Sequence, residues 1–265
     1  MKNRSAFLHA AALAVALLFP TGAAFATNYD EGTDGDLSDT MGAPTAFALT
    51  PGSNVLTATT VSGDEDYVAI SVPAGYVLQG IVPSAYSGAT KSFIAIQNGA
   101  TFTVPPTATT AAGLLGWAHF GVTGTTALVG TDILDDMGEG AGAAGFIPPL
   151  ASGTYAIWLQ ETGGVAVTYT LVFNTIPTPP PPVVKVSGKK VITTTKARVK
   201  FKGRVNGFAT RVEFRVGTKG AYKLAEGHTT WSLTAKVKHG RNLVSVRAVG
   251  IGGQSKTAKV TVFRK

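Results

Sequence analysis

The sequence contains no cysteine in its 265 residues. A chain without thiols forms no disulfide, no thiolate metal site and no lipid-modified cysteine. This excludes the small disulfide-stapled scaffolds that are common among exported proteins. The fold must therefore rest on packed apolar cores, and the chain is long enough for two of them.

Long hydrophobic runs are also scarce. One apolar run, Ala10–Phe19, follows the bases Lys2 and Arg4, and it is shorter than the roughly 20 residues that cross a bilayer as a helix. The small-x-small pattern Ala24-Phe25-Ala26 comes next, as at a signal peptidase site. We therefore predict a signal peptide over residues 1–26, a secreted or periplasmic mature chain and no transmembrane segment. An uncleaved anchor helix is the alternative.

Helical periodicity is missing from the mature chain. Charged residues make up only 14% of the sequence, which has 32 glycines and 14 prolines. Short alternating runs of apolar and polar residues, separated by Gly, Pro, Asn and Asp, are typical of β-strands and turns. We predict an all-β protein of two β-sandwich domains, the first jelly-roll-like and the second Ig-like, joined by a Pro-rich linker.

The clearest boundary in the chain is the run Pro177-Thr178-Pro179-Pro180-Pro181-Pro182. Such a run favours the polyproline II conformation and predicts a short, semi-rigid spacer. It divides the mature chain into an N-terminal module over residues 27–176 and a C-terminal module over residues 183–265, with the linker at residues 177–182.

Each module nearly lacks charge of one sign. The N-terminal module has thirteen Asp and Glu and one base, Lys91, which gives a net charge of −12. The C-terminal module has twenty Lys and Arg and two acids, Glu213 and Glu226, which gives a net charge of +18. Small soluble domains usually carry a net charge of about 2 to 8 in magnitude, so repulsion destabilises the C-terminal module in particular.

The acidic residues of the N-terminal module form three groups that are candidate calcium sites, because calcium takes several oxygen ligands from carboxylates and carbonyls. The groups are Asp30, Glu31, Asp34, Asp36 and Asp39; Asp64 and Asp66; and Asp132, Asp135, Asp136 and Glu139. None has the spacing of an EF-hand loop. We predict Asp34, Asp36, Asp64 and Asp66 as metal ligands. The alternative is that acids in turns only cap, bend and solvate the chain.

Three short motifs of the N-terminal module match those of a known family. They are Gly63-Asp64-Glu65-Asp66-Tyr67, Pro73-Ala74-Gly75-Tyr76, and Gly153-Thr154-Tyr155 followed by Tyr169-Thr170-Leu171. Together they resemble the bacterial pre-peptidase C-terminal domain over roughly residues 50–173. The resemblance implies a secreted accessory β-sandwich that binds substrate, matrix or calcium, or that helps export. The insertion from Thr101 to Pro149 is larger than this family leads us to expect.

The C-terminal module has seven expected strands, the number found in an Ig-like sandwich. The stretch Gly240–Ala248 resembles the penultimate strand of bacterial Ig-like and fibronectin III-like modules. The cysteine pair of true immunoglobulin domains is absent, so the resemblance implies the architecture alone. Trp231 is expected in the core of this module rather than on a sugar-binding surface.

Bases alternate with apolar residues along these expected strands. Four of them, from Arg198 to Arg204, are two residues apart and project from one face of one strand. The predicted polyanion-binding residues are Arg198, Lys200, Lys202, Arg204, Arg211, Arg215, Arg247 and Lys259. Spaced cations displace counterions from acidic polysaccharide, lipopolysaccharide or extracellular DNA. The alternative is a solvated face that discourages strand pairing.

Catalytic signatures are missing. The histidines of the mature chain, His119, His228 and His239, have no metal-ligand spacing, and a Gly-x-Ser-x-Gly elbow is absent. The glycine-rich stretch 138–145 lacks the Lys-Ser/Thr ending of a phosphate loop and predicts a flexible loop. We therefore predict no catalytic residues.

The sequence favours an exported, non-enzymatic binding or adhesion-type protein whose basic module tethers it to an anionic envelope or matrix polymer, with calcium on the acidic module. One alternative is a structural protein whose oppositely charged modules dock on each other or on other copies. Another is a hydrolase with a spatially assembled site, because triads assemble in space and leave no fixed spacing in the sequence.

Overall fold

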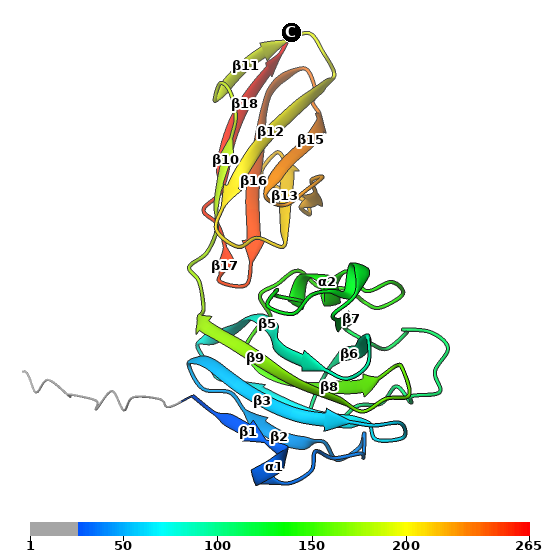
Figure 1. Ribbon diagram of the computed structural model, residues 1–265. Helices are drawn as coiled ribbons and strands as arrows, with labels where there is room; N and C mark the ends of the chain where they lie inside the picture. The colour runs from blue at the N-terminus through cyan, green and yellow to red at the C-terminus, as the bar shows by residue number, and fades with distance from the viewer. Residues whose placement is uncertain (1–25) are drawn as a thin grey trace, which may run out of the picture.

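The computed structural model describes residues 26–265 and confirms the all-β fold (Figure 1). The predicted signal peptide, apart from Ala26, lies outside the described residues. Within residues 26–265, none of the helices has the length and apolar character that a membrane crossing requires. The strands group into four sheets, two built from residues before the Pro-rich run and two from residues after it.

The N-terminal module is a sandwich of two sheets. The four-stranded sheet has the order β1 (Asn28–Asp30), β3 (Gly52–Thr60), β9 (Val167–Pro177) and β5 (Tyr76–Ser87). The five-stranded sheet has the order β2 (Thr45–Ala48), β4 (Asp66–Val72), β8 (Gly153–Glu161), β6 (Lys91–Asn98) and β7 (Gly116–Gly121). Strands β3 to β6 alternate between the two sheets. Strand β8 then lies between β4 and β6 in one sheet, and β9 lies between β3 and β5 in the other, which gives a jelly-roll-like topology.

The main core of this module lies between the two sheets. The alternation of β4 buries Val68, Ile70 and Val72 to at most 4% exposure, as the sequence predicts. Three short helices, α1 (Glu31–Asp34), η1 (Gly124–Thr126) and α2 (Leu134–Gly138), lie outside the sheets. A second apolar cluster, which includes Tyr67 and Trp158, covers the other face of the five-stranded sheet.

The C-terminal module is an Ig- or fibronectin III-like sandwich. One sheet has the order β10 (Val183–Val186), β12 (Arg198–Asn206) and β15 (Thr230–Lys236). The other has the order β11 (Val191–Thr194), β18 (Ala258–Arg264), β16 (Gly240–Gly250), β13 (Arg211–Val216) and β14 (Lys223–Leu224), with β17 (Gly253–Gln254) paired to β16.

Trp231 occupies the core of the C-terminal module, as expected, and is 1% exposed. Its cross-strand partner on β12 is Gly203. A β-carbon at Gly203 would lie 2.4 Å from the Trp231 ring and 2.0 Å from the carbonyl oxygen of Lys185 on β10. Glycine at this position therefore lets the indole pack directly beneath the strand.

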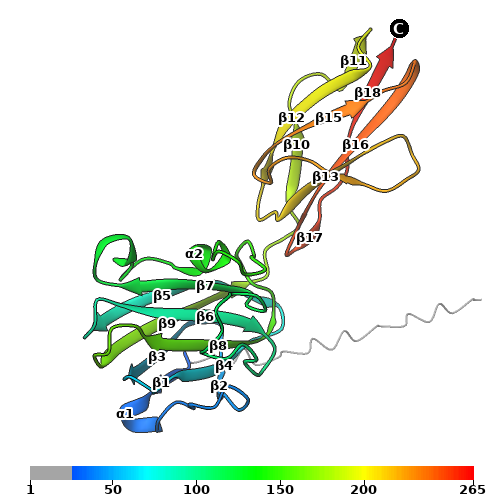
Figure 2. The same cartoon turned by 90° about the vertical axis from the view of Figure 1, so that its right-hand side faces the viewer.

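The Pro-rich linker is packed at both ends rather than free. The backbone N–H of Thr178 donates to the carbonyl of Gly75 in the N-terminal module at 2.8 Å. Farther along, the linker lies against the turn between β16 and β17, where a β-carbon at Gly252 would be 2.0 Å from the carbonyl oxygen of Pro179. The predicted spacer, residues 177–182, is thus held by contacts with both modules; Figure 2 shows its path between them.

We expect Gly252→Ala to release the linker from the C-terminal module, because the added methyl group overlaps backbone atoms that cannot rotate away. The two modules should then reorient more independently, so that their rotational correlation times from ¹⁵N relaxation diverge from the wild-type values. Gly42→Ala is the control, since a β-carbon there meets nothing within 4 Å. Unchanged correlation times in Gly252→Ala would show that the linker contact does not restrain the modules.

Candidate polyanion-binding surface

Strand β12 sends its bases outward and its apolar residues inward. Phe201 and Val205 are buried, whereas Arg198, Lys200, Lys202 and Arg204 are all exposed. Two residues of an extended strand rise about 6.8 Å, so successive cations are spaced by that distance along the strand. The structure therefore brings these four predicted residues together in one row.

The strands on either side of β12 add two more cations to the same face. Lys185 of β10 is the cross-strand partner of Arg204, and Lys236 of β15 is the partner of Arg198. Directly opposite residues of an antiparallel pair project to the same side of the sheet. We define the β12 face as the outer face formed by Lys185, Arg198, Lys200, Lys202, Arg204 and Lys236.

The outward positions of β15 between these cations are polar and uncharged. They are occupied by Thr230, Ser232 and Thr234, the cross-strand partners of Arg204, Lys202 and Lys200. An acid adjoins this strand at Glu226, whose carboxylate accepts a hydrogen bond from the Ser232 hydroxyl at 3.1 Å. In the described part of the chain, none of the six cations of the β12 face forms an ion pair.

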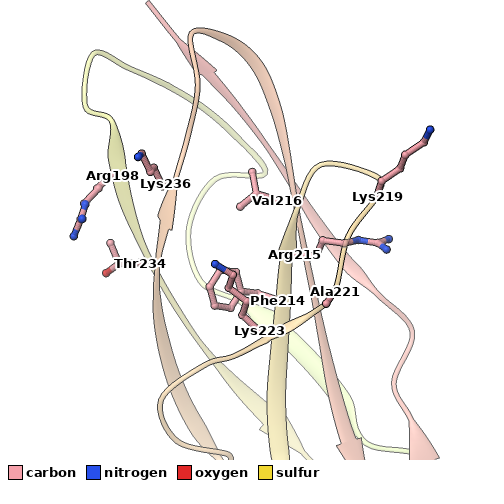
Figure 3. Close-up of a pocket in the computed structure, with 9 residues that line it drawn as sticks. All are labelled: Arg198, Phe214, Arg215, Val216, Lys219, Ala221, Lys223, Thr234 and Lys236. Atoms are coloured by element: carbon pink, nitrogen blue, oxygen red, sulfur yellow. The ribbon is translucent and has the colours of Figure 1, made fainter.

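A cavity of about 430 Å³ adjoins the β12 face where the edges of the two sheets meet (Figure 3). Its lining comprises Arg198, Phe214, Arg215, Val216, Lys219, Ala221, Lys223, Thr234 and Lys236. Figure 3 shows Val216 and the Lys223 ammonium turned toward the space between β13 and β15, whereas Arg215 and Lys219 extend away from it. Five of the nine lining residues are cationic and none is acidic, so the positive surface continues around the sheet edge.

The other four predicted residues project from the second sheet, away from the β12 face, although Arg215 also lines the cavity at the sheet edge. Arg211 and Arg215 belong to β13, Arg247 to β16 and Lys259 to β18, all in the second sheet. The eight predicted bases are therefore divided between two sheets. Alternation along a strand identifies its outward residues, but it does not tell which of two sheets the strand joins.

Three of these four bases are engaged within the module. Glu213, which is 8% exposed, accepts from Arg211 Nε at 2.7 Å and from Arg247 Nε at 2.8 Å. The guanidinium carbons of Arg215 and Arg247 lie 4.7 and 3.8 Å from the centre of the Tyr222 ring. These contacts direct the bases toward intramodular partners, so the second face is a poorer polyanion surface than the β12 face.

The acidic residues predicted to bind metal are only partly brought together. Asp36 and Asp64 lie with Asp39, and one oxygen from each carboxylate lies within 4.8 Å of the others. Asp39 was in the first acidic group of the sequence analysis but not among the four predicted ligands. Asp34 lies outside this cluster, and its carboxylate accepts from the backbone N–H of Asp30 at 2.8 Å.

Asp66 is a core residue rather than a loop ligand, which corrects the sequence prediction. It begins β4 and is 0% exposed, and the Tyr169 hydroxyl donates to its carboxyl group. Burial raises the pKa of Asp66 to about 8, while the hydrogen bond from Tyr169 opposes that shift. A largely protonated carboxyl at neutral pH is consistent with its place in the core.

The sequence prediction did not include four cations of the β12 face and the cavity that adjoins it. Lys185 follows the buried Val184, and Lys236 follows the buried Ala235, so strand alternation contains the signal for both. Lys219 and Lys223 lie in and after the loop that follows β13, where no periodicity exists to locate them.

Comparisons with known proteins give no family for the chain. No family model matches it, and no curated protein matches it. A solved structure of fibronectin III-like modules of CbhA from Clostridium thermocellum is 22% identical, covering 31% of this chain and 96% of that one, with a TM-score of 0.25. A similarity at that level identifies no function, and the resemblance to the pre-peptidase C-terminal domain remains an expectation from the sequence motifs.

We expect Glu213→Gln to lower the free energy of unfolding by about 1–2 kcal/mol at neutral pH, because two charge-assisted hydrogen bonds weaken. The hydrogen bond from Arg211 lowers the pKa of Glu213, burial raises it, and the contact with Arg247 lowers it further. The net result is a pKa below the ordinary value of 4.5. The ionised carboxylate therefore stabilises the fold above about pH 4.5, and that contribution is lost as the pH falls through the lower folded-state pKa.

Urea unfolding of the mature chain, residues 27–265, at neutral and acidic pH measures this effect. Glu226→Gln is the matched control, because Glu226 is exposed and accepts one hydrogen bond from a serine side chain. Equal destabilisation by the two variants at neutral pH would show that the Arg211–Glu213–Arg247 network adds nothing specific.

Proposed function

We propose that this chain is an exported, non-enzymatic binding protein whose C-terminal module holds an anionic polymer on the β12 face. The observation that carries the proposal is a row of exposed cations without ion-pair partners among the described residues. A purely solvating face would be expected to mix both signs of charge, as soluble surfaces usually do. A negatively charged ligand offsets the repulsion that the module otherwise bears.

The shape of the surface favours a linear ligand over a small anion. From Arg198 to Arg204 the strand advances six residues, or about 20 Å, and a cation appears at each second residue. Such a row matches repeated phosphates or carboxylates, as in acidic polysaccharide, lipopolysaccharide or DNA. The threonines and serine of β15 supply hydroxyl donors alongside the row.

The charge of the N-terminal module supports a second candidate function. Its net charge of −12 opposes the +18 of the C-terminal module, so that neighbouring copies attract each other through unlike modules. This assembly would use the same β12 face, and it would not require a polymer. Self-association that rises with protein concentration and falls with salt distinguishes it from polymer binding.

We expect Lys200→Glu/Lys202→Glu to weaken binding of the mature chain to an acidic polysaccharide or to DNA at least tenfold at low salt. The slope of log affinity against log salt should fall by about two, since two cations no longer displace counterions. Fluorescence anisotropy over a salt series, with each polymer in a separate arm, measures both quantities.

The matched control for this experiment is Lys256→Glu/Lys259→Glu, which changes the net charge equally at two exposed lysines outside the β12 face. Binding close to that of the wild type is expected for the control. Equal losses in the two double variants would show that net charge alone governs binding. A wild-type chain that binds neither polymer at low salt would contradict the proposed function.

Calcium binding by the N-terminal module stays a prediction. Thermal unfolding with and without calcium distinguishes metal binding from mere repulsion among the carboxylates of Asp36, Asp39 and Asp64. In EDTA, Asp36→Asn/Asp64→Asn should raise the midpoint of thermal unfolding, because like charges no longer crowd Asp39. In calcium, the wild type should gain stability and the variant should not. Asp135→Asn/Asp136→Asn, at two exposed acids of α2, is the control. No calcium effect on the wild type would refute the prediction.

A further inference from the structure

The outer face of the five-stranded sheet in the N-terminal module is aromatic, although the outer faces of antiparallel sheets are usually polar. Outward positions of β7 carry Trp117 and His119, and those of β6 and β8 carry Phe93 and Trp158. The inward residues of the same strands, such as Phe120, belong to the main core. Trp158 belongs to a second, smaller apolar cluster, and Phe93 and Trp117 pack against it, so the aromatic residues of this face form a second core outside the main one.

Strand register places these side chains in two rows. One row runs His119–Phe93–Gln160 across β7, β6 and β8. The adjacent row runs Trp117–Ala95–Trp158 across the same strands. Ala95, between the two indoles of the second row, has the smallest side chain of that row and is fully buried.

The aromatic rings contact one another across these rows. The Phe93 ring centre lies 4.8 Å from that of Trp158, 5.9 Å from that of Trp117 and 5.7 Å from that of His119. Trp117 and His119 are 5.6 Å apart with nearly perpendicular rings. Phe93, Trp117 and His119 are only half-buried, which leaves parts of their faces accessible.

Residues of the segment between β6 and β8 and aromatic residues of the sheet together line a cavity of about 750 Å³. From that segment, Val104, Ala111, Leu114, Ala141 and Gly142 are among the residues that line it. The volume lies within the range of small-ligand pockets, about 300–1,000 Å³.

The glycine-rich stretch 138–145, expected to be a flexible loop, packs against this site. The Trp117 indole N–H donates to the carbonyl of Ala141 at 3.0 Å. A β-carbon at Gly140 would lie 2.6 Å from the carbonyl oxygen of Trp117. The glycines thus permit a close backbone approach that fixes the orientation of the indole.

Uncharged polar groups are available beside the aromatic rings. The Gln160 side chain is half-buried and has no hydrogen-bond partner among residues 26–265. His119 Nδ1 lies 3.3 Å from the Ser92 carbonyl oxygen, and burial lowers the pKa of His119, so the ring is neutral at pH 7 with Nε2 as an acceptor. Thr109 and Thr110, which also line the cavity, carry further hydroxyl groups.

The cavity offers no free charge to a ligand. The one charged residue that lines it is Glu161, which is 6% exposed. Its carboxylate accepts from the backbone N–H groups of Gly163 and Gly164, at 2.5 and 2.6 Å. A ligand that suits the site therefore has apolar faces for the rings and neutral hydrogen-bonding groups for Gln160 and His119.

We propose that this cavity binds a neutral oligosaccharide. The C–H faces of a sugar ring stack on Trp117 and Phe93, because the positive edges of the C–H bonds meet the negative faces of the aromatic rings. The sugar hydroxyls both donate and accept hydrogen bonds, which matches the Gln160 amide and His119 Nε2. A purely hydrocarbon ligand would leave these polar groups unpaired, at a cost in affinity.

The proposal is independent of polyanion binding by the C-terminal module. A neutral sugar displaces no counterions, so its affinity is expected to be insensitive to salt. Lys200→Glu/Lys202→Glu should leave sugar binding unchanged. Failure of either proposal therefore leaves the other intact.

To test the proposal, the mature chain is titrated with neutral hexasaccharides of glucose and N-acetylglucosamine, in α- and β-linked series. The same protein is then applied to an array of neutral and acidic glycans. Tryptophan fluorescence follows the titrations, since Trp117 and Trp158 line the cavity. We expect Trp117→Ala to weaken binding at least tenfold and Gln160→Ala about threefold or more. Phe263→Ala, at a 42% exposed aromatic residue of β18, is the control and should bind as the wild type does.

Gln160→Ala keeps the test decisive if Trp117→Ala fails to fold, because Gln160 joins the sheet through its backbone and its side chain forms no hydrogen bond within residues 26–265. Three results would overturn the proposal: no glycan on the array is retained, acidic glycans alone are retained, or sugar binding persists unchanged in both cavity variants. Binding of an apolar dye that no sugar displaces would assign the cavity to an apolar ligand instead.

Discussion

The two-residue period of the β-strand is the constraint on which the rest of this structure depends. Along β12 it buries Phe201 and Val205 and leaves a cation at each outward position from Arg198 to Arg204. Along β6, β7 and β8 it sends one set of apolar residues into the main core and a second, aromatic set outward. Both candidate binding surfaces are therefore outer sheet faces, held by cores that do not depend on the ligand.

Charge segregation makes the two modules chemically different. The few acids of the C-terminal module include Glu213, which holds two arginines on the second face, whereas the cations of the β12 face have no such partner among the described residues. In the N-terminal module, Asp36, Asp39 and Asp64 cluster near α1 and the start of β4, whereas Glu161 is the one charged residue that lines the aromatic cavity. One chain thus presents a cationic surface, an acidic cluster and an aromatic cavity with a single, largely buried carboxylate.

The sequence predicts the parts of the fold that periodicity encodes. Long strands such as β4 and β15 begin and end where alternation indicates, but β1, β2 and β11, of three or four residues and paired in parallel, are too short to show a period. Alternation identified Arg198 and Arg211 as outward residues but could not assign them to different sheets. Pairing of Asp64 with Asp36 and Asp39, and the assembly of Trp117 with Trp158, depend on contacts between distant segments that spacing does not encode.

Backbone amide chemical shifts would show which residues of the C-terminal module contact an anionic polymer. The mature chain would be titrated with a short acidic oligosaccharide or oligonucleotide at low salt, and the shifted amides mapped onto the strands. If the β12 face holds the polymer, the changes are concentrated on β10, β12, β15 and the loop between β13 and β14. Changes concentrated on β13, β16 and β18, or spread evenly over both faces, would show that the β12 face is not the binding site.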